Sequence, residues 1–243
     1  MSILKEAVSL LLPSKCAVCG KLADTKDRLN VSLPGDLELC FDCMSKIVPE
    51  EKDKRWMLCL SNPYIGDPIP SMPLYMPFKY EGFFKGAVAA VKFKKDEELA
   101  VFLGGILGKL AKEDGIRADL IVPIPLSYER HRERGFNQAE VIAKEAGKVL
   151  GIPCAADVLK RTRDTLRQSE LKMDDSRASN IKDAFAVNPG WDIKGNSILI
   201  VDDVATTGHT LHEAGEILMR EGASSVAGIV LCGNRYVKND DPF

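Results

Sequence analysis

A continuous apolar run, Ile198 to Val201, ends in two adjacent acidic residues, Asp202 and Asp203. Four apolar residues in succession, without polar alternation, are typical of a strand buried on both faces of a parallel sheet. Open parallel sheets bind their ligands at the carboxyl ends of the strands. Because burying two unpaired carboxylates there would be costly, their position indicates that they recognise a ligand or a cation. The run therefore predicts an α/β fold with a binding site at the end of this strand.

The loop after the aspartates is suited to an anion. It consists of small and hydroxylated residues and leads into a helix that we expect to start at Thr210, with Glu213 at its N3 position. Gly208 permits a sharp turn, and the amides of residues 205–210 can converge on an anion that the helix dipole also favours. A plain strand, turn and helix would explain Thr210 as a cap, but not the two aspartates. The loop matches neither GxxxxGK[ST] nor GxGxxG, which disfavours nucleoside triphosphate hydrolysis and dinucleotide binding.

Strand and helix patterns alternate on both sides of this segment. Apolar residues recur at helical spacing from Phe84 to Val91, from Leu99 to Leu110, and from Asn137, where Glu140 completes a capping box, to Leu150. Short apolar runs predict further strands at 120–124, 184–187 and 226–231. Strands that alternate with helices predict a parallel, twisted sheet flanked by helices.

Four of the seven cysteines form a CxxC, twenty residues, CxxC arrangement: Cys16, Cys19, Cys40 and Cys43. Two residues between cysteines let both thiolates reach one ion from a tight turn, and two such turns complete a tetrahedron of sulfurs. Because four thiolates leave no open coordination position, we expect a structural zinc (Zn2+) rather than a catalytic one. A redox CxxC and an accidental spacing are the alternatives.

The composition of the chain limits the binding partners that it can have. Lys and Arg number 33 against 35 Asp and Glu, so the net charge of −2 provides no global positive field for nucleic acid or lipid. The apolar stretch from Ile3 to Leu12 has helical spacing and is too short to span a bilayer. No cleavage site follows it, so we expect a cytoplasmic protein with reduced cysteines.

Five prolines between Ser61 and Pro77 disfavour a regular helix or a central strand. We therefore expect three parts. Residues 1–60 hold the N-terminal helix and the zinc module, residues 61–77 form a proline-rich linker, and residues 78–243 form the α/β domain.

The segment from Ile198 to Thr210 resembles the phosphoribosyl pyrophosphate (PRPP) motif of type I phosphoribosyltransferases. The resemblance implies that Asp202 and Asp203 hold the ribose hydroxyls of PRPP. It also implies that the 5′-phosphate is held by the loop residues Ala205, Thr206, Thr207, Gly208, His209 and Thr210. His209 occupies a variable position of that loop, so we expect it to face solvent rather than act as an acid or base.

Nearly the whole chain is similar to one branch of these proteins, the ComF family, which is associated with bacterial competence and DNA uptake. The similarity is carried by residues 12–20, by 122–126 leading to 132–138, by 161–165 followed by Gln168, Arg177, Asn180 and Phe185, and by the aspartate loop. It implies a phosphoribosyltransferase-like domain behind a zinc module, and a DNA-uptake protein as a candidate partner. Where related sequences often carry a second pair of cysteine knuckles, this chain has only Cys59.

In the implied fold, Ile124, Pro125 and Leu126 lie in the loop that cradles pyrophosphate. Three arginines follow within five residues, and guanidinium groups bind diphosphate oxygens in pairs. They are Arg130, Arg132 and Arg134. Because Glu129 and Glu133 dilute the patch, an ordinary solvated surface is the alternative.

A second basic segment runs from Lys160 to Arg177, includes Arg161 and Arg163, and has no clear periodicity. We expect a mobile loop there. In the resembling enzymes a flexible loop closes over the site and excludes water during glycosyl transfer, with magnesium (Mg2+) on the leaving pyrophosphate. No residue stands out as a general base, and no segment identifies the acceptor.

Two functions remain open. One is a PRPP-dependent transferase; the other is a non-catalytic protein that senses PRPP or a nucleotide and contacts single-stranded DNA or a helicase-type partner. Lys92, Lys94 and Lys95 around Phe93 form a basic and aromatic cluster suited to a DNA backbone and to base stacking. The frayed end of a helix explains the same cluster equally well.

Overall fold

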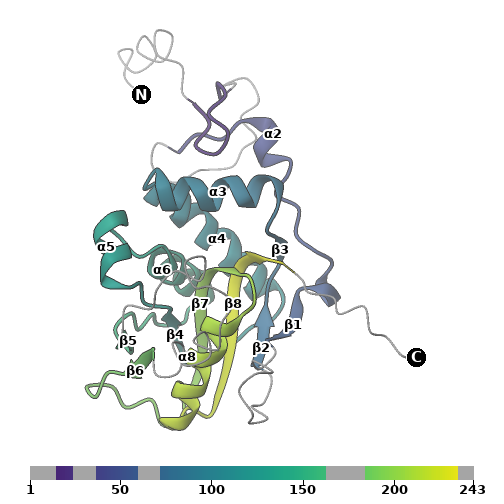
Figure 1. The fold of residues 1–243 in the computed structure, drawn as a ribbon. Helices are drawn as coiled ribbons and strands as arrows, with labels where there is room; N and C mark the ends of the chain where they lie inside the picture. The colour runs from purple at the N-terminus through teal and green to yellow at the C-terminus, as the bar shows by residue number, and fades with distance from the viewer. Residues whose placement is uncertain (1–14, 24–36, 60–71, 163–183, 235–243) are drawn as a thin grey trace, which may run out of the picture.

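A six-stranded mixed sheet forms the centre of the protein (Figure 1), in a computed structural model that describes residues 15–23, 37–59, 72–162 and 184–234. The strand order is β1-β2-β8-β7-β4, and β3 also pairs with β8. The sheet contains β1 (Trp56–Cys59), β2 (Met72–Tyr75), β3 (Phe78–Lys79), β4 (Leu120–Pro123), β7 (Ser197–Ala205) and β8 (Ser225–Gly233). A separate two-stranded sheet pairs β5 (Leu159–Arg161) with β6 (Phe185–Val187). The helices are α2 (Phe41–Met44), the 3-10 helix η2 (Lys52–Lys54), α3 (Gly82–Phe93), α4 (Glu97–Glu113), α5 (Tyr128–Arg134), α6 (Gln138–Leu150) and α8 (His209–Arg220).

The strand that carries the two aspartates, β7, is an interior strand of this sheet. It pairs in parallel with β8, from Ser197 opposite Ser225 to Ala205 opposite Gly233, and in parallel with β4 on its other side. Its residues Ile198 to Val201 are all buried. The expected parallel core flanked by helices is confirmed, and the antiparallel pairing of β1 with β2 makes the whole sheet mixed.

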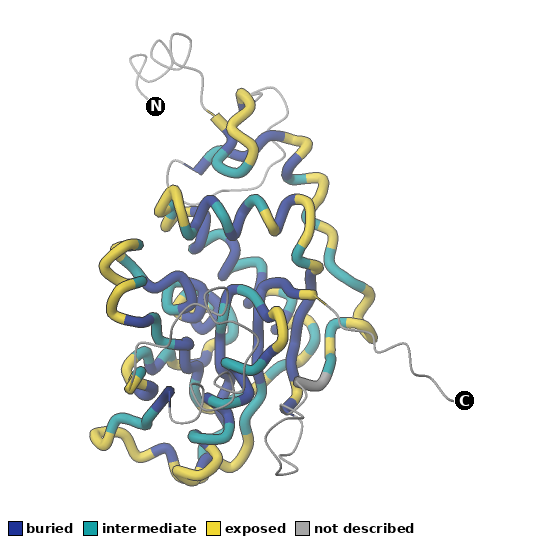
Figure 2. The backbone as a smooth tube through the Cα atoms, in the orientation of Figure 1, coloured by how far each residue is buried: buried dark blue, intermediate teal, exposed yellow. Residues whose placement is uncertain are grey.

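Alternate residues of β7 face two different layers of helices, as the two-residue period of a strand requires. Leu199 and Val201 belong to the core that includes residues of α3, α4 and α6. Ile198 and Ile200 belong to the core that includes residues of α8. Figure 2 shows the central strands buried between these layers. Apolar residues on both faces explain why the run lacks polar alternation.

Helices α4 and α6 pack closely because α4 has glycines where the two helices meet. A Cβ atom at Gly104 would lie 2.8 Å from the carbonyl oxygen of Ile142, and one at Gly108 would lie 2.8 Å from the Cα of Ala146. Gly105 lies on another face of α4, and a Cβ there would meet nothing within 4 Å. The absence of two side chains therefore sets the distance between these helices.

The expectation of no central strand between Ser61 and Pro77 was wrong. β2 lies within that range and pairs with both β1 and β8. Pro73 is tolerated because the paired residues of the β8 ladder begin at Leu74, so the missing N–H of the proline costs no bond there. Residues 61–71 and the predicted helix at 3–12 lie outside the described residues, and the domain boundaries at 60 and 77 stay predictions.

The start of α8 also differs from the expectation. The helix begins at His209, and Gly208, with a φ of 77°, is its N-cap. Thr210 therefore lies inside the first turn instead of capping it. Glu213 accepts a hydrogen bond at Oε1 from the amide of Ala184, 2.9 Å away, so it holds the residue before β6 rather than the end of its own helix.

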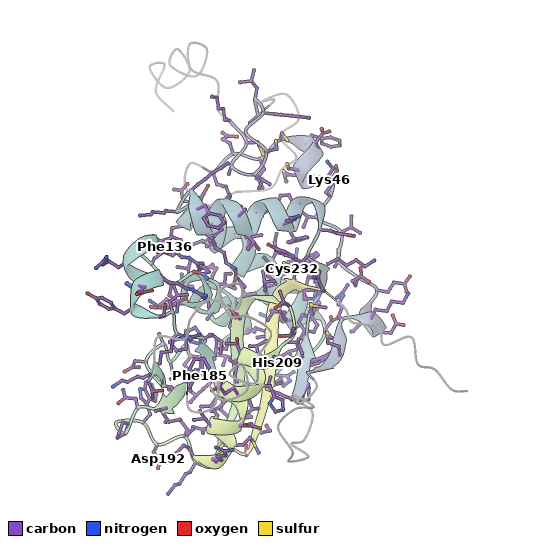
Figure 3. The ribbon with its side chains drawn as sticks, viewed as in Figure 1. Lys46, Phe136, Phe185, Asp192, His209 and Cys232 are labelled. Atoms are coloured by element: carbon purple, nitrogen blue, oxygen red, sulfur yellow. The ribbon has the colours of Figure 1, made fainter. Side chains whose placement is uncertain are left out.

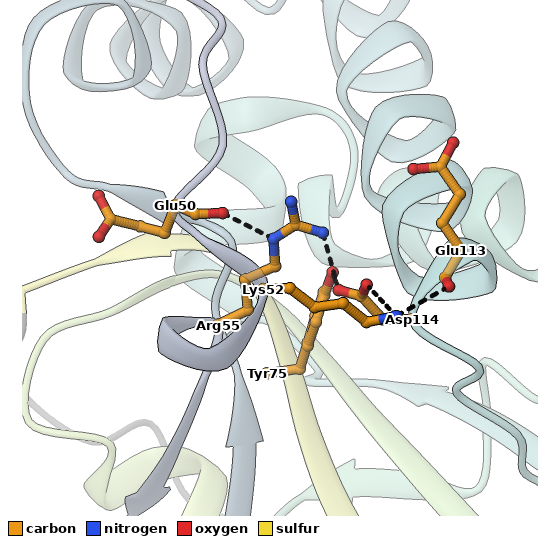
Figure 4. Close-up of polar contacts among 6 residues, drawn as sticks. All are labelled: Glu50, Lys52, Arg55, Tyr75, Glu113 and Asp114. Atoms are coloured by element: carbon orange, nitrogen blue, oxygen red, sulfur yellow. Dashed lines mark hydrogen bonds and ion pairs between the residues drawn. The ribbon is translucent and has the colours of Figure 1, made fainter.

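A buried polar cluster joins the segment before β1 to the end of α4 (Figure 4). The Oδ2 atom of Asp114 accepts hydrogen bonds from the hydroxyl of Tyr75 at 2.7 Å and from Nη1 of Arg55 at 2.8 Å. Lys52 Nζ lies 3.4 Å from the other carboxylate oxygen. Burial alone would raise the pKa of Asp114, but its bonds with Tyr75, Arg55 and Lys52 lower it instead. The cluster fastens the N-terminal part of the described chain to the main domain.

Candidate functional site

A pocket of about 260 Å³ lies at the carboxyl ends of β4 and β7. It has both cationic and acidic walls. Its lining residues are Tyr80, Lys92, Ile124, Pro125, Leu126, Arg130, Arg134, Gln138, Arg161, Asp202, Asp203, Val204, Thr206 and Thr210. The structure thus brings the aspartates, the loop after them, the loop after β4 and three arginines to one place, as an open parallel sheet favours.

The two aspartates differ in their surroundings. Asp203 is 5% exposed, and its Oδ2 atom lies 2.5 Å from Nζ of Lys92, which comes from α3. Asp202 is half-buried, and its Oδ1 atom accepts a hydrogen bond from the amide of Asp203 at 2.8 Å. Burial, followed by the neighbouring charge of Asp203, raises the pKa of Asp202 well above its usual range. The two adjacent carboxyl groups therefore differ in their partners: Asp203 pairs with a lysine, and Asp202 accepts a backbone hydrogen bond.

The loop from Ala205 to Thr210 leaves its amides available. Within the described residues, the amides from Thr206 to Leu211 donate no backbone hydrogen bond. Of the loop residues, Thr206 and Thr210 line the pocket, Thr207 is exposed, and Ala205 and Gly208 are buried. His209, the first residue of α8 (labelled in Figure 3), is half-buried, although we expected it to face solvent, and it is not among the residues that line the pocket. Free amides at the start of a twelve-residue helix are suited to an anion.

The loop after β4 is held by side chains from two other elements. Asn137, the N-cap of α6, donates from Nδ2 to the carbonyl oxygen of Ile124 at 3.0 Å. Arg161 donates from Nε to the carbonyl oxygen of Pro125 at 3.2 Å, and its guanidinium lies 5.0 Å from the centre of the Phe185 ring. Because two of its carbonyls are bonded from outside, this loop is fixed where it borders the pocket.

Helix α5 places two of the three candidate arginines in the pocket and the third outside it. Its N-cap is Ser127, whose side chain accepts a hydrogen bond from the amide of Arg130. Arg130 and Arg134, one helical turn apart, line the pocket, whereas Arg132 lies between them on the exposed side. Burial lowers the pKa of Arg134, although the charges of Asp203 and Asp202 oppose this effect. The prediction of pyrophosphate contact at Arg132 therefore finds no support in its position.

Two residues of the predicted mobile loop, Lys160 and Arg161, lie in a strand instead. Lys160 and Arg161 are part of strand β5, where Lys160 is exposed and Arg161 reaches the pocket. Arg163 and the rest of the segment to residue 183 lie outside the described residues. Arg161 is held in place because β5 pairs with β6. The sequence shows no periodic pattern at this strand because β5 has only three residues.

The predicted basic and aromatic cluster does not form one surface. Lys92 turns into the pocket, while Lys94 donates from Nζ to the carbonyl oxygen of Ala17, 3.0 Å away in the cysteine-containing segment. Phe93 is 79% exposed, and Lys95, with a φ of 58°, follows the end of the helix. Helical geometry divides these neighbours because successive residues point about 100° apart.

Sequence reasoning missed several residues of the pocket. Tyr80 follows the short strand β3 and reaches the pocket only because β3 pairs with β8. Gln138, the first residue of α6, is 3% exposed, and its Oε1 atom has no hydrogen-bond partner among the described residues. Its place beside Asn137, at the end of the segment 132–138 that carries the family resemblance, was a signal that could have identified it. Nothing in the local sequence placed Lys92 beside Asp203.

The four cysteines converge as predicted. Their sulfur atoms lie within 4.8 Å of one another, and Sγ of Cys19 lies 3.6 Å from Sγ of Cys40. Burial opposes ionisation of Cys16, but backbone hydrogen bonds from Cys19, Cys40 and Val18 lower its pKa to about 7. Burial and the neighbouring thiols raise the pKa of Cys43. The side chain of Cys59 lies outside the described part of the chain.

Comparison with known proteins identifies related sequences. Residues 131–241 match the phosphoribosyl transferase domain family. The DNA utilization protein YhgH of Escherichia coli O157:H7 is 28% identical over 226 residues, which cover 89% of this chain and 89% of that protein. The chain is a homologue of YhgH. Competence protein ComFC of Bacillus subtilis is 30% identical over 156 residues, covering 63% of this chain and 61% of ComFC.

Several other relatives align with this chain over only part of their own length. In several of them the aligned region spans 65% or less of the relative's length. Among solved structures, glutamine PRPP amidotransferase from B. subtilis, complexed with ADP and GMP, has a TM-score of 0.39 and 18% identity. That match covers 55% of this chain and 26% of the other. Among the described residues, no helix combines the length and the apolar character needed to cross a membrane.

Proposed function

We propose that this YhgH and ComFC homologue binds PRPP and transfers its phosphoribosyl group to an acceptor. One observation carries the proposal: a single pocket joins two acidic side chains, a loop with free amides and three arginines. These are the groups that vicinal hydroxyls, a phosphate and a diphosphate need. The match of residues 131–241 to the phosphoribosyl transferase domain family supports the same ligand.

Each part of PRPP is assigned to one wall of the pocket. The 5′-phosphate binds the amides from Thr206 to Leu211, and the hydroxyls of Thr206 and Thr210 add donors. The ribose hydroxyls bind Asp202 and Asp203. The diphosphate lies along the loop after β4 and binds the guanidinium groups of Arg130, Arg134 and Arg161.

The transfer is driven by charge and orientation in this scheme. The bond between ribose C1 and the pyrophosphate oxygen breaks, and a bond from C1 to a nucleophilic atom of the acceptor forms. Carboxylates near the ribose stabilise the positive charge that develops on the ring, and the arginines stabilise the departing pyrophosphate. Burial of the pocket floor keeps these interactions strong. The acceptor is left open, since no described residue identifies it.

Magnesium and zinc have different roles in the proposal. The oxygen-rich donor set of Asp202 together with the ligand's phosphates fits magnesium, which would neutralise charge on the leaving pyrophosphate. The cysteine cluster fits zinc. Sulfurs at about 2.3 Å from a tetrahedral ion are about 3.8 Å apart, and the Cys19 and Cys40 sulfurs are separated by 3.6 Å. Four thiolates complete the coordination of that ion, so its role is structural.

The names of the relatives suggest the setting of this activity. We propose that it serves competence or another use of DNA, as the names of YhgH and ComFC indicate for those proteins. A non-catalytic PRPP sensor with a DNA or protein partner is the other outcome of the test. The division of the Lys92 to Lys95 cluster weakens the part of that alternative that relied on single-stranded DNA at this site.

The test is calorimetric titration of the metal-loaded protein with PRPP and magnesium, combined with pyrophosphate release across a panel of bases and amines. Asp202→Asn should lose affinity and any turnover. Asp192→Asn is the matched control, because Asp192 is exposed, accepts a hydrogen bond from the amide of Lys194 and does not line the pocket (Figure 3). Binding without turnover on any acceptor would favour the sensor. Absence of binding by the wild-type protein to PRPP or ribose 5-phosphate would refute the proposal.

A further inference from the structure

We infer that Lys92 is a positioning residue of the sugar-phosphate site, which holds the carboxylate of Asp203 in place for the ribose. The inference rests on the proposed function for the identity of the ligand. It assigns a role to a residue of α3, which lies outside the matched domain region of 131–241.

The ion pair is the contact that compensates the burial of Asp203. Apart from Lys92 Nζ, which lies 2.5 Å away, its Oδ2 atom has no hydrogen-bond partner among the described residues. The side chain of Asp203 is 7% exposed and that of Lys92 is 21% exposed. An uncompensated carboxylate at this depth would be strongly disfavoured. The orientation of Asp203 therefore depends on the ammonium group of Lys92.

Lys92 is placed where it can hold Asp203 and still leave room for a ligand. Its charge comes from the last turn of α3, and Lys92 lines the same pocket as the loop after β4. The other charged or titratable groups that line this pocket are Tyr80, Asp202, Arg130, Arg134 and Arg161. The buried thiol of Cys232 on β8 also interacts with Asp203 electrostatically. Among these, Arg130 and Arg134 belong to the proposed diphosphate wall. Lys92 is the cation in ion-pair contact with Asp203.

Lys92 and both aspartates line the same pocket, and the amide of Asp203 donates a hydrogen bond to Oδ1 of Asp202. A shift of Asp203 after loss of Lys92 would therefore disturb both members of the aspartate pair. A direct contact between Lys92 and the ligand's phosphates is the competing role, and the two roles make different predictions in a double-mutant cycle.

The experiment compares Lys92→Met, Asp203→Asn and the double variant for binding of PRPP and of ribose 5-phosphate in the metal-loaded full chain. Lys85→Met is the matched control, because Lys85 is an exposed lysine of the same helix. We expect Lys92→Met to weaken ribose 5-phosphate binding about 10- to 100-fold, the range seen when supporting residues are removed. Lys92→Arg should recover part of the loss, and Lys85→Met should bind as the wild type does.

Non-additivity is the decisive result. In the Asp203→Asn background, removal of Lys92 should cost little more affinity, because the carboxylate that it positions is already absent. Full additivity, or an unchanged affinity of Lys92→Met, would overturn the inference. If the wild-type protein binds neither ligand, the proposed function fails, and the crystal structure of Lys92→Met still decides the inference. The Asp203 carboxylate should leave the position in which Lys92 holds it, and an unchanged position would overturn the inference.

Discussion

Asn137 donates a hydrogen bond from Nδ2 to the carbonyl oxygen of Ile124 at 3.0 Å, while its Oδ1 atom accepts one from the amide of Ala139 at 3.1 Å. One buried side chain thus begins α6 and fixes the loop that borders the pocket. The same amide group serves both because it has a donor and an acceptor at opposite sides. Stability and ligand binding are therefore linked at this residue.

Asn137→Ala should destabilise the protein by about 2 kcal/mol, because it removes a helix cap and leaves a buried carbonyl without a donor. It should also weaken binding of pyrophosphate. Urea unfolding and calorimetry measure the two effects. Asp96→Ala is the matched control, since Asp96 caps α4 at 2.9 Å and lies outside the pocket lining. An equal loss of pyrophosphate affinity in both variants would contradict the link.

Replacing two different glycines of α4 with alanine should change the stability of the protein in opposite directions. Gly108→Ala should destabilise the protein by about 1–3 kcal/mol, because the new Cβ would lie 2.8 Å from the Cα of Ala146. Gly105→Ala meets nothing within 4 Å and should stabilise the helix by about 1 kcal/mol. Thermal or urea unfolding of both variants is sufficient. Similar changes of the same sign would mean that close approach of α4 and α6 does not limit the packing.

The Asp114 cluster predicts a pH-dependent contribution to stability. The folded-state pKa of Asp114 lies below its unfolded value, so its carboxylate stabilises the fold above about pH 4. This stability is lost as the pH falls through the folded-state pKa. Asp114→Asn should therefore cost about 3 kcal/mol at neutral pH, where it breaks a buried pair, and less in acid.

The measurement is urea unfolding of both proteins across this pH range, compared at equal pH so that the other carboxyl groups cancel. Asp53→Asn, at an exposed position of η2, is the control. A difference between the wild type and Asp114→Asn that stays constant from pH 7 down to strongly acidic conditions would show that the carboxylate is not the source. Tyr75→Phe should cost about 1 kcal/mol through the lost hydrogen bond alone.

Removal of the metal is expected to act on the cysteine module and on α3. The backbone of Ala17 accepts a hydrogen bond from Lys94, and a Cβ at Gly86 would lie 2.9 Å from Val18, so the module rests directly on α3. Chelation or Cys40→Ser should release about one zinc per chain and change the circular dichroism spectrum. Cys154→Ser, outside the cluster, should retain the metal. A purified protein with well under one zinc per chain and no spectral response to chelation would contradict the zinc assignment.

Local sequence determined those parts of the protein whose chemistry is contained in a short segment. The unbroken apolar run at 198–201 indicated a buried parallel strand, because both of its faces carry apolar side chains. The two CxxC pairs indicated one metal cluster, because each turn places two thiolates together. The amide loop at 205–210 was visible for the same reason, since the turn and the following helix are adjacent in the chain.

Tertiary structure alone decided which distant residues complete the site. Lys92 reaches Asp203 only because α3 packs over the carboxyl end of the sheet, and Tyr80 arrives through the pairing of β3 with β8. Strand β2 formed despite Pro73 because neighbouring strands supplied the ladder on either side of it. Such placements depend on contacts between residues far apart in sequence, and no local periodicity or spacing encodes them. For that reason the sequence alone left a DNA contact and the frayed end of a helix as equal explanations of Lys92, whereas the fold places its ammonium group against a buried carboxylate.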